Sequence, residues 1–138
     1  MPDDPPASDL ERAPVTLTVP ASSAYVTLIR TAAAVLAARA DIPLDRLDDL
    51  RLAVDEAAAL LISDADAGVP LTCTMRGYAD AEGSSGVIVE LSTTSTSRQA
   101  PDRTGFAWAV LTALVDEVEA RVDMTGSLTI TLRTGTMP

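Results

Sequence analysis

The residues in this sequence best suited to acid–base chemistry are two adjacent carboxylates, Asp55 and Glu56. A carboxylate with a shifted pKa can act as a general acid or base, so the pair is a candidate catalytic site. Leu52, Glu56 and Leu60 are spaced by four and therefore stack along one side of a helix. In the alternative interpretation the pair is a solvated helix edge, where Arg51 pairs with Asp55 across one turn. The sequence alone leaves both interpretations open.

The composition removes several kinds of active site. The chain has no histidine, which is the commonest general base and metal ligand. Cys73 is the only cysteine, which excludes an internal disulfide and a zinc site built from several cysteines. Cys73 itself lies in an alternating apolar pattern and is interpreted as an inert core residue. No metal site is predicted.

The charge of the chain points to a protein partner. Twenty acidic and ten basic side chains give a net charge of −10, so direct binding to nucleic acid or to a membrane surface is not expected. The same charge would steer the chain toward a basic protein, and residues 41–56 hold six acids against two arginines. Helix capping and solubility also explain that stretch. Trp108, the only tryptophan, is either an interface anchor or a residue buried beneath a sheet. The candidate partner-binding residues are Asp48, Asp49, Arg51, Asp55 and Trp108.

The length and composition are those of one folded domain. A chain of 138 residues, 47% of them hydrophobic, can bury a substantial core. No apolar run reaches the roughly 20 residues of a membrane-spanning helix, and the acidic N-terminus does not resemble a secretion signal. We therefore expect a cytoplasmic protein with its domain at 15–134. Residues 1–14, which contain four prolines, are expected to form a disordered acidic tail.

Hydrophobic periodicity predicts the elements that position these residues. Alternation predicts strands at 15–19, 71–76, 87–94, 118–124 and 128–133. Helical spacing predicts one helix at 23–40, a second after Pro43 and a third at 107–118. The first helix is expected to bury one stripe, made of Tyr25, Leu28, Ile29, Ala32, Val35 and Leu36.

These elements predict an α+β fold. Each strand has one apolar and one polar face, which favours a two-layer sandwich: a mixed, mostly antiparallel five-stranded sheet covered on one face by three helices. The other face, rich in threonine and charge, is expected to meet water. The polar segment 93–104 is expected to be a long surface loop. It is either disordered or contacts a partner through Arg98, Asp102 and Arg103.

Two long strings within this element order carry a family resemblance. The sequence LRLAVDEAAALLI at 50–62 and GFAWAVLTALVDEVE at 105–119 resemble the RsbW/UsfX-type anti-sigma factors of the GHKL ATPase superfamily, and most closely the actinobacterial UsfX branch. The resemblance covers about 15–133. It implies a Bergerat-type fold, a homodimer, and a protein that holds a stress- or sporulation-type sigma factor inactive. In that family a STAS-class anti-anti-sigma protein displaces the sigma factor.

The resemblance also implies positions for ATP and magnesium, and this sequence departs from most of them. Glu56 stands where the family has its glutamate, but Leu60 stands where the magnesium-binding asparagine belongs, and an alkyl chain offers no oxygen. Where the family has an Asp that contacts adenine, residues 91–96 read LSTTST and contain no Asp. The hydroxyls of Ser92 and Thr94 are therefore the candidate adenine contacts. The glycine-rich segment is reduced to Gly105. The expectation is weak or absent ATP binding, with no resident cofactor.

Three functional hypotheses follow from the sequence. The first is a binding protein, an anti-sigma factor with a degenerate nucleotide site that works by covering its sigma factor. The second is an Mg-ATP-dependent serine/threonine kinase of the RsbW type, which would phosphorylate its STAS antagonist with Glu56 as base. In the third, the bound partner is not a sigma factor.

Overall fold

The computed structural model describes residues 13–79 and 81–136. Residues 1–12 of the expected acidic tail lie outside that range, so the tail stays a prediction. The elements, in chain order, are β1 (Val15–Pro20), a 3-10 turn η1 (Ser23–Tyr25), α2 (Val26–Arg39), α3 (Leu44–Asp64), β2 (Pro70–Ala79), β3 (Ser85–Thr94), α4 (Phe106–Leu114), β4 (Glu117–Val122) and β5 (Ser127–Gly135). None of the described helices is both long and apolar enough to cross a membrane.

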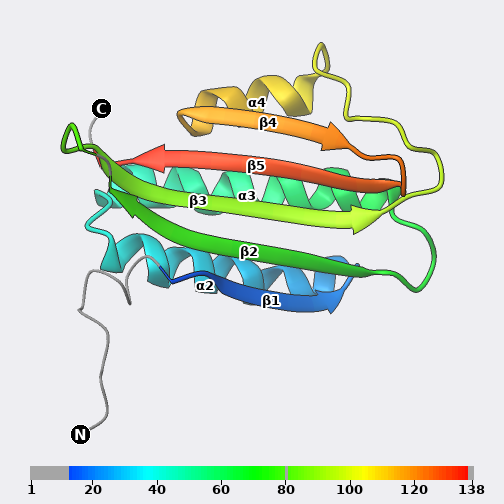
Figure 1. The fold of residues 1–138 in the computed structure, drawn as a ribbon, viewed down its shortest axis with the longest axis horizontal. Helices are drawn as coiled ribbons and strands as arrows, with labels where there is room; N and C mark the ends of the chain where they lie inside the picture. The colour runs from blue at the N-terminus through cyan, green and yellow to red at the C-terminus, as the bar shows by residue number, and fades with distance from the viewer. Residues whose placement is uncertain (1–12, 80, 137–138) are drawn as a thin grey trace, which may run out of the picture.

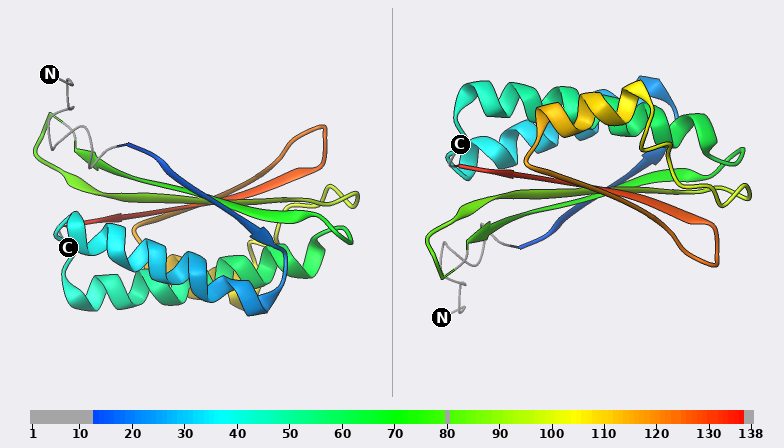
Figure 2. Two further views of the ribbon diagram at one scale, coloured as in Figure 1. Left: turned by 90° about the horizontal axis from the view of Figure 1, so that it is seen from below. Right: turned by 90° about the horizontal axis from the view of Figure 1, so that it is seen from above.

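The five strands form a sheet in the order β1-β2-β3-β5-β4, and the three α-helices cover one of its faces (Figures 1 and 2). This confirms the expected two-layer α+β sandwich. Every pairing in the described sheet is antiparallel, so the expected mixture of directions was wrong. The reason is that α2 and α3 each run the length of the sheet, in opposite directions. The chain therefore returns to the end where β1 finished before it starts β2.

Alternation along each strand separates the core from the open face. Leu91 of the central strand β3 lies opposite Cys73 of β2 and Ile130 of β5, and all three are fully buried against the helices. Between these positions the strands present threonines and charged residues to the open face, as the sequence predicted. Two of these threonine pairs, Thr16–Thr74 and Thr18–Thr72, approach within 3.2 and 3.5 Å across β1 and β2.

The first helix packs only part of the expected stripe against the core: Ile29, with Ala32 and Leu36 partly buried. Ile29 is buried as predicted, but Leu28 and Val35 are each 56% exposed, and Tyr25 is 42% exposed. The buried residues of α2 are Val26, Ile29 and two alanines, Ala33 and Ala37. Alanines let α2 approach the sheet closely, while the larger side chains remain on its outer side, unpaired within the described chain.

The third helix is shorter than predicted. α4 ends at Leu114. The next residue, Val115, has an extended backbone, with φ of −133° and ψ of 166°. Val118, which the sequence pattern placed both at the end of this helix and at the start of the next strand, lies in β4 opposite Leu132 of β5. β-Branched residues favour strands, and pairing with β5 provides the hydrogen bonds that a longer helix would have supplied within itself.

Cys73 provides a first testable prediction. Its side chain is fully buried, and burial raises the pKa of its thiol from 9.0 to about 12. We expect no reaction with a thiol reagent at neutral pH in the folded protein, and full reaction in urea, measured by absorbance of the released chromophore. Between pH 9 and about 12 the thiol ionises in the unfolded chain but not in the folded one. The free energy of unfolding should therefore fall as the pH rises above 9. Rapid labelling without denaturant would contradict the buried position.

A second prediction concerns Thr134 on β5, which is 1% exposed. Its hydroxyl has no hydrogen-bond partner within the described part of the chain. Replacing Thr134 with valine keeps the shape and removes a buried unsatisfied group, so the free energy of unfolding should rise by about 1 kcal/mol. The control is Thr93→Val: that buried hydroxyl donates to the Pro70 carbonyl at 3.0 Å, so its loss should lower stability by a similar amount. Urea unfolding of both variants measures these opposite changes in the free energy of unfolding.

Candidate functional site

Glu56 and Leu60 occupy the positions that the sequence predicted on α3. They lie one turn apart on the same side of the helix, and both are half-buried. Leu60 packs against the hydrophobic core, so its neighbourhood is apolar as well as lacking an oxygen ligand. Glu56 therefore stands without the second oxygen that a hard cation would require beside it.

The two candidate hydroxyls on β3 do not join this site. Leu91 and Thr93 point to the helix-covered face and are buried, so Ser92 and Thr94, which alternate with them, point to the open face. The sheet thus separates both hydroxyls from Glu56, and the expected cluster is not assembled. The alternation already visible in the sequence carried this information, because Leu91 was correctly predicted to face the core.

The segment before α4 is held by hydrogen bonds among its own residues, 102–105. Gly105 is the N-cap of α4, and its N–H donates to the Asp102 carbonyl at 3.3 Å. The Asp102 carboxylate accepts from both the hydroxyl and the N–H of Thr104, and these bonds lower its pKa. Since the folded pKa is the lower one, this contribution to stability is present near neutral pH and is lost in acid. The carboxylate thus takes up the N–H of Thr104, the residue before the N-cap of α4.

Residues 95–105, which connect β3 to α4 and include most of the predicted loop 93–104, are attached to the body of the domain at both ends. At the start, the Thr96 N–H and hydroxyl both donate to the Asp66 carboxylate, at 3.0 and 3.2 Å. The Ser95 N–H donates to the Gly126 carbonyl at 2.9 Å in the β4–β5 turn. At the end, the Arg103 guanidinium donates to the Ala120 carbonyl at 2.8 Å. The sequence left two expectations for this loop, disorder or contact with a partner protein. The contacts favour neither, because the loop is hydrogen-bonded to the domain and Asp102 and Arg103 have partners within the chain.

Trp108 lies in the core. Its side chain is 8% exposed, and the Arg103 guanidinium stands 5.5 Å from its ring centre. Of the two interpretations of this tryptophan, burial beneath the sheet is therefore the one that the structure favours. The exposed aromatic of α4 is its neighbour Phe106, which is 84% exposed.

The ion pairs on the helix layer differ from the predicted one. Asp55 does not pair with Arg51. It accepts two hydrogen bonds from Arg30 of α2, at 3.1 and 2.8 Å, while Arg51 lies 3.7 Å from Asp48. Asp55 therefore joins two helices and is not free to act as a base beside Glu56. The sequence offered no signal for this pair, because its members are 25 residues apart.

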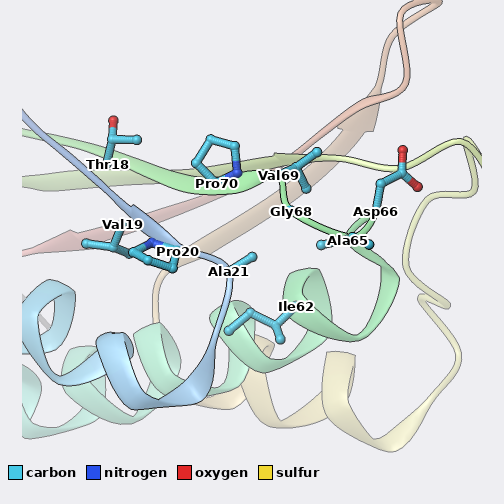
Figure 3. Close-up of a pocket in the computed structure, with 11 residues that line it drawn as sticks. Thr18, Val19, Pro20, Ala21, Ile62, Ala65, Asp66, Gly68, Val69 and Pro70 are labelled. Atoms are coloured by element: carbon cyan, nitrogen blue, oxygen red, sulfur yellow. The ribbon is translucent and has the colours of Figure 1, made fainter.

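A hollow of about 570 Å³ opens at the end of the sheet where β1 finishes and β2 begins (Figure 3). Its walls come from the end of β1 and from the connection between α3 and β2, and they are mainly apolar side chains. The one charged side chain in this lining is Asp66, whose Oδ1 accepts two hydrogen bonds from Thr96. The lining of the hollow is therefore mainly apolar.

The residues present do not fit a bound Mg·ATP. The magnesium position is Leu60, the chain contains no asparagine, and the candidate adenine contacts lie on the wrong face of the sheet. Nor do any three Asp, Glu or Cys side chains group closely enough within the described residues to hold a metal ion.

Comparison with known proteins agrees with the fold. A family model described as a histidine kinase-like ATPase domain matches residues 19–133. The chain is 34% identical over 127 residues to the anti-sigma-F factor RsbW of Mycobacterium tuberculosis, in strains CDC 1551 / Oshkosh and H37Rv, over 86% of this chain and 73% of the relative. The solved structure of the RsbU and RsbW domains of Rv1364c from Mycobacterium tuberculosis superposes with a TM-score of 0.62 and 17% identity. That match covers 91% of this chain and 36% of the solved one, about a third of its length, and shows the shared fold.

Proposed function

Because the chain belongs to the family of histidine kinase-like ATPase domains, we propose that it is an anti-sigma factor that holds an alternative sigma factor inactive by binding it. The observation that carries the proposal is the 34% identity to the anti-sigma-F factor RsbW, which extends over 86% of this chain. The family model itself matches residues 19–133, from the end of β1 into β5. In this role the protein acts in the cytoplasm, in a stress response or in sporulation.

The proposed mechanism is occlusion without turnover of nucleotide. Bound to this chain, the sigma factor cannot present the same surface to RNA polymerase, and no bond has to be made or broken. The absence of an oxygen at Leu60 and the attachment of residues 95–105 support this mechanism over a kinase. Relief then comes from competition by a STAS-domain antagonist for the bound chain, with ATP playing no part.

The acidic part of α3 is the proposed contact surface for the sigma factor. Asp48 and Asp49 lie on this helix in a chain of net charge −10, which steers a basic partner toward it. Asp48 and Asp55 are already paired with Arg51 and Arg30, so they add less free charge than the sequence suggests. We leave the buried Trp108 out of this surface.

We propose a homodimer formed along the outer edge of β1. The two exposed sheet edges differ in character: the VTLTVP sequence of β1 has no charged residue, whereas β4 carries Glu117, Glu119 and Arg121. Charged edges resist pairing, and an uncharged edge can accept a strand from a second copy. Val15→Lys should then lower the solution mass toward that of a monomer, measured by light scattering, while Glu119→Lys on the other edge should not. A monomeric parent chain would refute the dimer.

The test of the proposed function compares repression with phosphate transfer. The purified chain is added to RNA polymerase carrying the cognate sigma factor, with and without Mg·ATP. We expect repression that saturates at one chain per sigma factor under both conditions, and the same repression by Glu56→Gln. Labelled ATP with the cognate STAS protein tests the kinase alternative. Phosphate transfer that disappears in Glu56→Gln would overturn the sequestration mechanism, and absence of repression would overturn the anti-sigma role.

A further inference from the structure

A groove runs between α2 and α3 on the outer side of the helix layer, where the two helices lie side by side (Figure 2). It contains two hollows of about 410 and 280 Å³. The larger one is lined by the apolar side chains of Val26, Ala59 and Ile62 and by three hydroxyl side chains, those of Ser23, Thr27 and Ser63. The exposed positions in this lining show that the groove opens to solvent and away from the sheet.

The Arg30–Asp55 pair lies at the centre of the groove and lines both hollows. Arg30 donates to both oxygens of Asp55 and, at 3.3 Å, to the hydroxyl of Thr27. The two charges therefore satisfy each other and leave the middle of the groove close to neutral. On one side of this pair a ligand meets the apolar side chains of the larger hollow, and on the other side it meets Leu52 beside charged side chains.

One large apolar side chain of the groove is open to solvent. Leu52 lines the smaller hollow and is 55% exposed. Exposed apolar side chains beside a groove are typical of a protein-binding surface. A row of apolar side chains at helical spacing fits a groove between two helices, so the expected ligand is an amphipathic helix.

The charges around the groove select the kind of helix. α3 begins with Asp45, Asp48 and Asp49, and the arginines among them, Arg46 and Arg51, pair with Asp116 and Asp48. A partner helix flanked by arginine or lysine complements this rim. A second copy of this chain would instead bring the same acidic α3 against it.

We infer that this groove binds a basic amphipathic helix of the sequestered partner, with the apolar ridge of that helix seated over Ala59 and Leu52 and its basic flank against the start of α3. The inference rests on the proposed function for the identity of the partner. The shape and charge of the groove do not depend on it.

The direct test uses a labelled model peptide and a pair of charge-matched variants. The probe is a fluorescent helix of about 18 residues, with leucines at helical spacing and arginines elsewhere, and its anisotropy reports binding. Ala59→Arg places a long charged side chain in the lining of the groove, whereas Ala113→Arg adds the same charge at an exposed alanine of α4. We expect Ala59→Arg to weaken binding about tenfold or more, and Ala113→Arg to match the parent chain. Equal affinities for the two variants would overturn the inference.

Two further measurements separate the possible failures. Leu52→Arg should also weaken peptide binding, and circular dichroism of all three variants checks that they fold. A peptide with glutamates in place of the arginines should bind the parent at least about tenfold more weakly, and equal binding would refute the role of the acidic rim. In the transcription assay, full repression by Ala59→Arg would overturn the groove as the partner site while leaving the anti-sigma role intact. A parent chain that binds the basic peptide but does not repress would refute the anti-sigma role instead.

Discussion

Replacing Trp108 with alanine is expected to lower the free energy of unfolding by about 3 to 5 kcal/mol. The indole is 8% exposed and belongs to the cluster of buried side chains between α4 and the sheet, so its removal leaves a cavity. The substitution also removes the aromatic face next to Arg103, which connects the end of the 95–105 loop to β4. Urea unfolding followed by circular dichroism measures the loss without needing the tryptophan signal.

The matched control lies two residues away on the same helix. Phe106 is also aromatic but is 84% exposed, so Phe106→Ala should change stability by no more than about 0.5 kcal/mol. The comparison separates the two interpretations of Trp108 that the sequence left open. Similar small changes for both variants would mean that Trp108 is not a core residue and would restore its candidacy as an interface anchor.

The second large effect is expected from Gly86→Ala. Gly86 lies opposite Gly135 where β3 pairs with β5, and a Cβ added there would stand 2.1 Å from the Thr134 carbonyl oxygen. That contact is with backbone, which cannot rotate away as a side chain would. The two strands must separate locally, and we expect a loss of about 3 kcal/mol or more.

Gly83 provides the control for this substitution within the same hairpin. It has a positive φ of 88°, but a Cβ there would have nothing within 4 Å. Gly83→Ala should therefore cost only the strain of a left-handed backbone, about 1 to 2 kcal/mol. Thermal or urea unfolding of both variants tests the order. A larger loss at Gly83 than at Gly86 would contradict the close approach of β3 and β5.

Most of the architecture was predictable because it follows from local periodicity. The alternation around Leu91 and Ile130 predicted both the strands and the face that each presents to the helices, and the structure confirms it. The prediction failed where two apolar stripes competed. On α2 the structure buries Ala33 and Ala37 and leaves Leu28 and Val35 outside, since the fit of small residues against the sheet decided the matter.

For the candidate site, too, some features follow from the sequence and others only from the tertiary structure. The sequence by itself determined which atoms are available: a glutamate at 56, an alkyl chain at 60, no histidine, and a net charge of −10. Side-chain chemistry and helical spacing are properties of the chain, so folding does not alter them.

Only the tertiary structure decided which groups meet. Asp55 pairs with Arg30 across 25 residues, Asp66 accepts from Thr96 across 30, and a third contact, from Arg103 to the Ala120 carbonyl, spans 17. Each of these contacts depends on how separate elements are placed in space. A sequence pattern that repeats every two or four residues holds no information about partners at such distances, so the attachment of the 95–105 loop and the groove between α2 and α3 became visible only in the folded chain.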